Sequence, residues 1–539
     1  MTRHKNPKTL ETLALDSIAE FIVHTGRQLI SKTTPIPPPS SKKFLDYIGI
    51  NRRDHRLKKE QEDWESQQHI DMTCLHDYIH SGLPLDLSRK VVTWSLKAVD
   101  RFARELKCTY EHLNWYNREF HNAFVLKMLI SSIIDPQLSL LHLSPMRWNT
   151  AVGQILWDNV YKMPKLEVLE FSVQAHIPNR DIIQGLSCLE HLFSFTMRRC
   201  TDRIIVTLVT NCPKIEYLDI CSSPDVTDAS VDYILKLNQL KELLFYHTSI
   251  TKKGLTKILK GIAHWNCNFA DGRVRQNGLT NFHAGRPSTE HMKLLVQVCP
   301  FLTSVRLSHI EGDMSILSVL NDLIEIEIIH GNFTYNNIKG LLKLKGNNLR
   351  TLVLIKMKEV DLNFICESCM GLKTLVLLRG RSSVSIEALK AMNPAPLQHL
   401  EYLVLDSTCG IVFVELLLSF CVNIKRIQIG HTENIDDTMM ERVFRCNPMI
   451  SLEMIILISS TNALSMRTVR YLVNSCPNIY LLGDLREWNQ ITEEEIRDFQ
   501  SEIRSCNLDI SLALNLLEKS PGISIQDSDE TFLGSHVLH

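Results

Sequence analysis

The chain has 539 residues, of which 44% are apolar and 22% charged, and its formal net charge is −1. This near-neutral balance argues against a protein drawn to nucleic acid or to an anionic membrane surface by its overall charge. No apolar run reaches the roughly 18–20 residues of a membrane span, and the first ten residues are polar and basic rather than secretory. We therefore expect a cytoplasmic or nuclear protein.

The first expected element is an amphipathic helix within residues 1–30. Its apolar residues recur at helical spacing: Leu10, Leu13, Ala14, Ile18, Phe21 and Ile22. Such a stripe has two possible uses, which the pattern alone leaves open. The helix packs on its own domain, or it presents these apolar anchors to the groove of a partner.

Residues 31–75 read as a linker, and residues 76–135 as a small helical module. The linker begins with the proline-rich stretch 33–41 and continues into the basic run 51–59, which we interpret as solvated chain rather than as a nuclear signal. Order resumes at Leu83-Pro84-Leu85-Asp86-Leu87. The apolar positions that follow at helical spacing are Val91, Val92, Leu96, Val99 and Phe102.

A repeat with an L-x-x-L-x-L core fills residues 136–517. Its clearest copies begin at Leu349, Leu372 and Leu400. The first apolar position of each copy, called the marker below, falls at Leu138, Leu166, Leu192, Ile215, Leu240, Leu279, Leu302, Leu323, Leu349, Leu372, Leu400, Ile424, Leu452 and Ile479. The mean period of about 26 residues lies in the range of leucine-rich repeats. We therefore predict the α/β class, a leucine-rich-repeat solenoid of curved parallel strands with outer helices, and a C-terminal tail at 518–539.

The 15 cysteines fit the same repeat. Cys212, Cys299, Cys369, Cys421 and Cys476 each precede a marker by three residues, which predicts small buried thiols where a helix meets the next strand. Cys366 and Cys369 have the spacing of a zinc or redox pair, but no second pair or histidine pair completes such a site. An odd number of thiols fits a reducing compartment.

Motifs for catalysis are missing from the sequence. It has no phosphate-binding glycine loop, no H-E-x-x-H and no G-x-S-x-G. The acidic group at 493–495 follows Thr492, and Thr492 with Glu495 reads as a capping box that opens a helix. We therefore expect a binding protein rather than an enzyme, without cofactor or metal.

The inner face of the predicted solenoid is the expected binding surface. In the later repeats, apolar residues occupy the positions between the core leucines: Val353, Ile355, Val376, Leu378, Val404, Met454, Ile456 and Leu481. An exposed apolar run of this length is typical of an interface with another protein. Alternatively, the C-terminal tail covers it with its own apolar residues, among them Ile523 and Phe532.

Two short segments carry a resemblance to subunits of cullin-RING ubiquitin ligases. Residues 9–18, with Leu10, Ala14 and Ile18, resemble the elongin-binding box of von Hippel–Lindau-type receptors, with Ala14 where cysteine is usual. Residues 83–91 are similar to the cullin-docking box of the Zyg and PRAME families, in which a leucine-rich solenoid follows. The same residues also resemble the opening of an F-box, and the Cys-Pro-x-Leu repeats resemble those of F-box leucine-rich proteins.

The resemblance implies a substrate-recognition subunit that holds its target on the solenoid and catalyses nothing itself. Its adaptor-binding residues would be Leu10, Leu13, Ala14, Ile18, Leu83, Pro84, Leu87 and Val91. Its partners would be elongin B/C and a cullin, or an F-box adaptor and a cullin, together with an unknown protein substrate. A leucine-rich scaffold without a ligase is the alternative from a different class.

Overall fold

The computed structural model describes most of the chain. The described residues are 10–32, 73–77, 79, 85–108, 120–142, 149–171, 179–267, 278–392, 395–406, 409–430, 435–458, 463–483 and 485–513. They form two compact units, and the boundary between the two lies between Leu240 and Lys241.

The first unit begins with a packed group of helices. Its members are α1 (Leu10–Lys32), α4 (Leu85–Glu105), α5 (Phe120–Ile133) and α6 (Thr150–Asp158). Helix α1 packs on both α4 and α5, and α5 packs on α6. The core between them is apolar and closed, since Ile22, Phe102, Leu129 and Trp157 are each at most 2% exposed.

Helices α1 and α4 run in the same direction. Glu11 pairs with Lys90 at 2.5 Å, Asp16 accepts a hydrogen bond from Trp94 at 3.0 Å, and Arg27 pairs with Glu105 at 2.8 Å. In these three pairs, a later residue of α1 always contacts a later residue of α4, so the two helices are parallel. They also lie close, because a Cβ atom added at Gly26 would come within 2.6 Å of the Phe102 ring.

The first unit continues into strand-and-helix coils. Its strands pair in parallel, in sequence order: β1 (Leu140–His142), β2 (Val168–Phe171), β3 (Ser194–Met197) and β4 (Tyr217–Asp219). Short helical segments connect them: η2 (Val160–Lys162), α7 (Asn179–Leu186) and α8 (Asp202–Asn211), while η3 (Asp228–Ser230) and α9 (Val231–Ile234) follow β4. Thr227 caps η3, since its side-chain oxygen accepts a hydrogen bond from the Ala229 amide.

The second unit repeats the same coil. Its strands are β5 (Glu242–Leu244), β6 (Asn281–Gly285), β7 (Ser304–Ser308), β8 (Glu325–Asn332), β9 (Thr351–Lys358), β11 (Thr374–Leu378), β13 (Tyr402–Leu405), β14 (Arg426–Gly430), β15 (Met454–Ile458), β16 (Leu481–Gly483) and β17 (Ser511–Ala513). They pair in parallel in this order. The minor strands β10 (Val360–Asp361) and β12 (Ser382–Ser383) form a separate pair.

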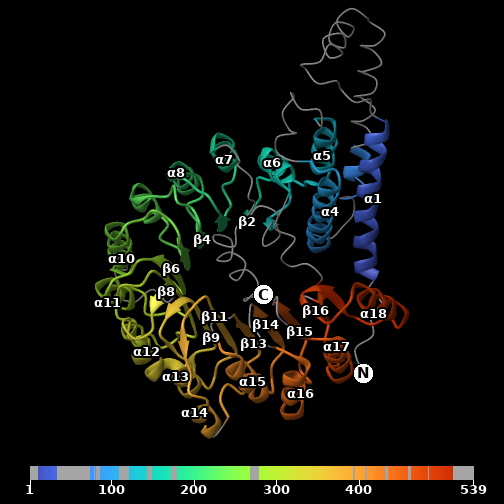
Figure 1. Cartoon of the computed structure of the whole chain (residues 1–539). Helices are drawn as coiled ribbons and strands as arrows, with labels where there is room; N and C mark the ends of the chain where they lie inside the picture. The colour runs from blue at the N-terminus through green and yellow to red at the C-terminus, as the bar shows by residue number, and fades with distance from the viewer. Residues whose placement is uncertain are drawn as a thin grey trace, which may run out of the picture. The chain divides into compact units, whose positions relative to one another are not determined.

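Helices line the outer side of the second unit (Figure 1). They are α10 (Lys252–Cys267), α11 (Thr289–Val298), η4 (Met314–Val319), α12 (Ile338–Lys345), η5 (Gly346–Asn348), α13 (Leu362–Ser368), α14 (Ile386–Ala391), α15 (Ile411–Phe420), α16 (Asp437–Cys446), α17 (Met466–Ser475), η6 (Leu485–Glu487) and α18 (Glu493–Ser505). The strands lie on the inner side (Figure 1).

The predicted repeat is confirmed marker by marker. All fourteen marker residues are buried, and the most accessible of them, Leu138, is only 3% exposed. A strand begins two residues after every marker, including the weak copy at Leu279, which leads into β6. The chain is therefore an α/β leucine-rich-repeat solenoid with a helical group at its start. Strand β17 is an addition that the sequence pattern missed.

The cysteines also lie where the repeat places them. Cys212, Cys299, Cys369, Cys421 and Cys476 are all buried and free. The Cys212 thiol donates to the Leu189 carbonyl of the preceding coil at 2.6 Å. Burial raises the pKa of the Cys366 and Cys369 thiols to about 12, so both are neutral packing groups.

Candidate partner-binding surfaces

Helix α1 has an apolar side that faces away from its own domain. Leu13 is 50% exposed and Phe21 46% exposed, and Ala14 between them is also exposed. On the opposite side, Leu15 and Ile22 are buried against α4 and α5. The helix therefore carries two apolar sides, of which only one serves the core.

The predicted stripe of α1 divides between these two sides. Ile22 packs inward, Ile18 is half-buried at the boundary, and Leu13, Ala14 and Phe21 point outward. The side chain of Leu10 lies outside the described residues. Successive residues turn by about 100°, so the stripe of six residues is wider than one contact surface. The packing role is therefore confirmed for the inward side, and partner docking by the outward side stays a prediction.

The second predicted box lies at the start of α4. Leu83 and Pro84 fall outside the described residues, and Leu87 is half-buried. Val91 is only 1% exposed, because it faces the core of the helical group. The prediction that Val91 contacts an adaptor needs correction, since a partner cannot reach it while α4 stays packed. The accessible side of α4 is instead polar, with Lys90 and Lys97 exposed.

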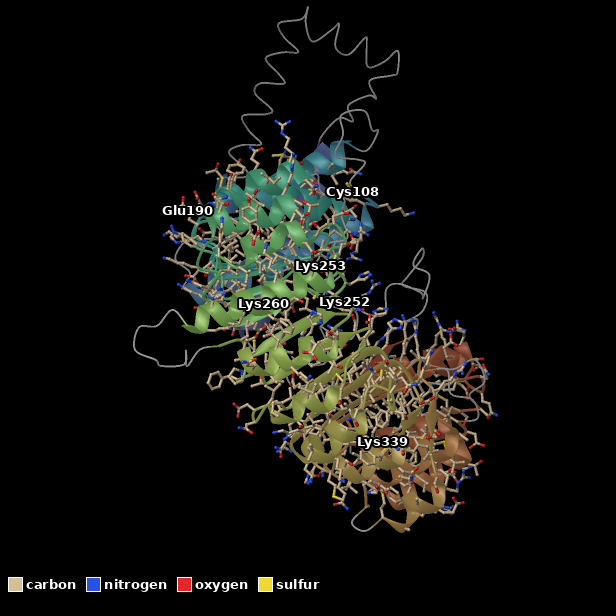
Figure 2. All side chains as sticks on the ribbon, turned by 90° about the vertical axis from the view of Figure 1, so that its left-hand side faces the viewer. Cys108, Glu190, Lys252, Lys253, Lys260 and Lys339 are labelled. Carbon is tan, nitrogen blue, oxygen red and sulfur yellow. The ribbon has the colours of Figure 1, made fainter. Side chains whose placement is uncertain are left out.

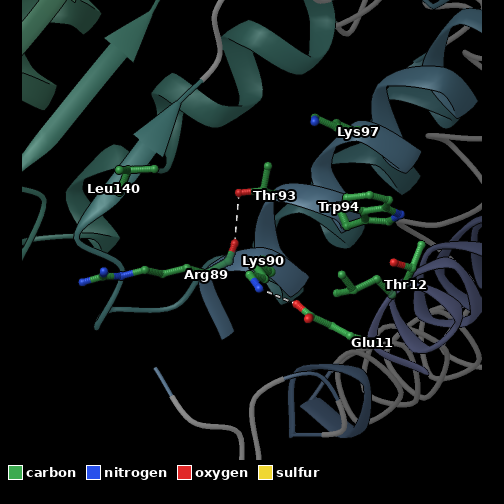
Figure 3. Close-up of a pocket in the computed structure, with 9 residues that line it drawn as sticks. Glu11, Thr12, Arg89, Lys90, Thr93, Trp94, Lys97 and Leu140 are labelled. Carbon is green, nitrogen blue, oxygen red and sulfur yellow. Dashed lines mark hydrogen bonds and ion pairs between the residues drawn. The ribbon is translucent and has the colours of Figure 1, made fainter. Parts of the chain in front are cut away.

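A groove separates the first turns of α1 from α4 (Figure 3). Its volume is about 440 Å³, and its lining is Glu11, Thr12, Leu15, Arg89, Lys90, Thr93, Trp94, Lys97 and Leu140. The ion pair of Lys90 with Glu11 crosses one end of it (Figure 3). Lys97 lies over the Trp94 ring at 5.7 Å from the centroid, so the wall of the groove is a cation stacked on an aromatic surface.

The strand register brings the predicted apolar residues of the inner face together. Val353, Val376 and Val404 are direct neighbours across β9, β11 and β13, and Ile355 pairs with Leu378. Met454 pairs with Leu481 across β15 and β16. The register therefore forms two apolar groups, one on β9, β11 and β13 and one on β15 and β16, and Gln428 of β14 separates Val404 from Ile456. We call the two groups together the apolar strip.

The exposure of this strip differs from the prediction. Val353, Ile355, Val376, Val404 and Ile456 are all at most 7% exposed, and only Leu378, Met454 and Leu481 are half-buried. Neighbouring strands lie about 4.8 Å apart, so branched side chains in one row shield one another. The strip is apolar as expected, but it is not an open patch. The tail proposed as its cover lies outside the described residues.

The earlier strands of the second unit form a polar half of the inner face. In one row, His283 of β6 is followed by Arg306 of β7 and Glu327 of β8. Arg306 pairs with Glu327 at 2.5 Å, and its side chain is only 11% exposed. The guanidinium also lies over the Tyr246 ring at 5.6 Å from the centroid. This is a largely desolvated ion pair on an aromatic support.

The same cluster also changes the pKa of His283. Burial of its ring and the positive charge of Arg306 hold the pKa of His283 well below its usual range, so the ring is neutral near pH 7. The sequence analysis missed Arg306, His283 and Tyr246 on this face. The repeat could have predicted two of them, because Arg306 and His283, like Glu327, directly follow the second core residue of their copies.

The described ranges contain neither a cluster of metal ligands nor a helix that could span a membrane. Across them, no three His, Cys, Asp or Glu side chains converge in a way that could hold a metal ion. None of the described helices has the length and apolar character that a membrane span requires.

No family model and no curated protein matches the chain. Solved structures similar to it include an internalin from Listeria monocytogenes, with 14% identity over 62% of this chain and 85% of that chain and a TM-score of 0.33. A complex of Rad7 and Elc1 in yeast shows 15% identity over 85% of this chain and 96% of that chain, with a TM-score of 0.35. A leucine-rich-repeat protein of Leptospira interrogans shows 14% identity over 64% and 95%, with a TM-score of 0.28. None of these likenesses assigns a family or a function.

Proposed function

We propose that this protein is a substrate-recognition subunit of a cullin-RING E3 ubiquitin ligase. Its N-terminal helical group docks the adaptor and cullin, and the inner face of its solenoid holds the target protein. Ubiquitin transfer belongs to the partner subunits. The receptor acts by position, because it raises the effective concentration of target lysines near the ubiquitin-loaded enzyme.

The outward apolar side of α1 carries this proposal. Leu13 and Phe21 are roughly half exposed on a helix whose other side is already fully packed. Large apolar side chains kept in water at helical spacing favour a helix-in-groove contact with a partner. Ala14 lies on the same side, at the position where the box that the sequence resembles usually has cysteine. The rigid attachment of α1 to α4 and α5 would present these residues without prior folding.

The experiment that tests the docking role is co-purification of the tagged full chain from cells. We expect elongin B/C and a cullin with the wild-type chain. The variant Leu10→Ser with Ala14→Phe should lose them, because a bulky ring at Ala14 obstructs a close helix contact. The control is Gln28→Ser with Ser31→Phe, which introduces the same two side chains at exposed positions of α1.

Three results separate the competing functions. Elongin B/C that is retained by the Leu10 and Ala14 variant would show that this side of α1 is not the docking surface. Capture of an F-box adaptor instead would assign the chain to an SCF ligase, which uses the residues around Leu87. Recovery of neither adaptor nor cullin would leave a leucine-rich scaffold without a ligase.

A second pair of variants tests the inner face. Leu378 and Leu481 are half-buried members of the apolar strip, so glutamate at both positions is tolerated better than at buried Val376. We expect Leu378→Glu with Leu481→Glu to lose target proteins while the adaptor is retained. Leu344→Glu, on the outer helix α12 and 67% exposed, is the control that should leave both unchanged. Unchanged target capture in the double variant would move the binding surface elsewhere.

A further inference from the structure

Six consecutive coils of the second unit place a basic residue or a histidine at the same repeat position. These residues each follow their marker by seven positions: His247, Arg286, His309, His330, Lys356 and Arg379. All six have a left-handed backbone, with φ between 49° and 60°. Residues other than glycine seldom adopt this conformation. Because all six share it at the same repeat position, they occupy equivalent places in their coils.

The strand register makes these six residues one row. Gly285 pairs with Ser308, Ser308 with Ile329, Ile329 with Ile355, and Ile355 with Leu378. The residues that follow these partners are therefore neighbours from Arg286 to Arg379. His247 precedes them, because β5 pairs with β6. At about 4.8 Å per strand, the row is roughly 24 Å long.

Two neighbouring side chains of the row are in direct contact. The rings of His309 and His330 stack with centroids 4.3 Å apart and an interplanar angle of 21°. His247, Arg286 and His309 are exposed, and His330, Lys356 and Arg379 are half-buried. Arg286, Lys356 and Arg379 are cations at neutral pH. We call these six residues the strand-end row.

Two lysines of the second unit outside this row join neighbouring coils. Lys252 and Lys339, labelled in Figure 2, lie on the outer helices α10 and α12. Lys252 pairs with Glu311, and Lys339 pairs with Asp361 at 2.6 Å, so both tie neighbouring coils together. In the first unit, the equivalent positions are Arg199 and Ser222, with the same left-handed backbone. A continuous basic row is therefore a property of the second unit and not of the repeat itself.

We propose that the strand-end row binds an extended acidic peptide segment of the target protein. This inference rests on the proposed function and names the class of its substrate. An extended peptide places alternate side chains on one face about 6.6–6.8 Å apart. A row of 24 Å therefore spans about four acidic side chains, which meet its three cations and the histidines between them. Arginine and lysine bind carboxylates through charge-assisted hydrogen bonds.

A peptide fits this surface better than a nucleic acid does. Glu325 and Glu327 lie on the inner face of β8, between the strands that carry Arg286 and Arg379. Glu327 is paired with Arg306, so the Glu325 carboxylate is the one that repels a continuous phosphate backbone, whereas a peptide can place a neutral side chain beside it. The net charge of −1 also lacks the overall positive charge typical of nucleic-acid-binding proteins.

The test uses the purified full chain and a fluorescein-labelled peptide of six Glu-Ser repeats, followed by fluorescence anisotropy. In the row variant, Arg286, His309, Lys356 and Arg379 are all replaced by Asn, which removes charge and still accepts a left-handed backbone. We expect at least tenfold weaker binding, equivalent to about 1.4 kcal/mol. The matched control, Arg199→Asn with Ser222→Asn, has the same backbone position in the first unit and should bind as the wild type does.

Two further arms make the result decisive. A variant with Asp527→Asn, Asp529→Asn and Glu530→Gln tests whether the acidic C-terminal tail competes for the row; tighter peptide binding by this variant supports the proposal. The proposal is overturned if the wild type and the row variant bind the peptide equally. It is also overturned if neither the wild type nor the tail variant binds the peptide. Tighter binding of an oligothymidylate of equal charge also overturns it. These measurements need no ligase subunit, so they stand even if co-purification fails.

Discussion

The indole N–H of Trp94 in α4 donates a hydrogen bond of 3.0 Å to Oδ1 of Asp16 in α1. This bond lies halfway along the parallel pair of helices, between the ion pairs at either end. It is partly buried, and its acceptor is charged, so it is stronger than the exposed ion pairs around it. It fixes the rotation of α1, and therefore which apolar side of the helix faces outward.

Replacement of Trp94 by Phe should loosen α1. We expect a loss of about 1 kcal/mol, because one charge-assisted hydrogen bond is removed while most of the ring remains. Amide hydrogen exchange should become faster within α1 and change little in the second unit. Lys90→Ala is the control, since its ion pair with Glu11 joins two side chains that are 57% and 44% exposed. An equal effect of both substitutions would contradict this ranking.

Asp437 joins two neighbouring coils of the second unit. Its carboxylate accepts hydrogen bonds from the Ser465 amide at 3.1 Å, the Ser465 hydroxyl at 2.5 Å and the Thr468 hydroxyl at 2.6 Å. Asp437→Ala leaves these donors without their acceptor and should lower the free energy of unfolding by about 2 kcal/mol. Chemical denaturation measures the loss. Asp498→Ala, at an exposed position of α18, should change it by less than about 0.5 kcal/mol.

The same carboxylate predicts a pH dependence. Burial alone would raise the pKa of Asp437, but the hydrogen bonds from Ser465 and Thr468 outweigh it and lower the pKa below its ordinary value of 3.8. A lowered pKa in the folded state stabilises the fold above about pH 4, and this contribution is lost as the pH falls through the folded pKa. The stability difference between the wild type and Asp437→Asn should therefore be constant from pH 5 to 7. It should shrink below pH 4, and a difference that grows on acidification would contradict the assignment.

The marker residues should be the most sensitive positions of the solenoid. Leu372 has no exposed surface, so Leu372→Ala removes buried methyl groups and leaves a cavity. We expect a loss of about 2–5 kcal/mol in the free energy of unfolding. Leu344→Ala, the same substitution at 67% exposure, should stay within about 0.5 kcal/mol of the wild type. Similar losses at both positions would show that Leu372 is not part of the core.

Thiol reactivity should separate the structural cysteines from the surface ones. Burial raises the pKa of the Cys366 and Cys369 thiols to about 12, so their thiolate fraction at pH 8 is on the order of one in ten thousand. Iodoacetamide at that pH should leave both unmodified in the native chain and alkylate the exposed Cys188 and Cys446. Peptide mass spectrometry identifies the modified residues. Early alkylation of Cys369 would contradict its buried position.

The sequence predicted the repeat well, because each coil needs an apolar residue at the same buried point. The pattern did not predict β17, because Asp509 occupies the position where a marker leucine is expected. Only the alternation of Ile510, Ser511 and Leu512 indicates a strand there. Pattern alone did not reveal which side of α1 is free, since apolar residues lie on both sides. It also did not reveal the strand-end row. The positive φ of arginine, histidine and lysine residues leaves no compositional trace comparable to a glycine.

The parallel course of α1 and α4 has a consequence for how the chain tolerates change. From the end of α1 at Lys32, the polypeptide must travel back roughly 35 Å to begin α4 at Leu85, which an extended strand covers in about ten to eleven residues. The intervening stretch, residues 33–84, is several times longer than that minimum. Engineers could therefore shorten residues 33–72, which precede the buried Leu75 and Ile79, or open them with a protease site, and still recover the two helices as a bound pair.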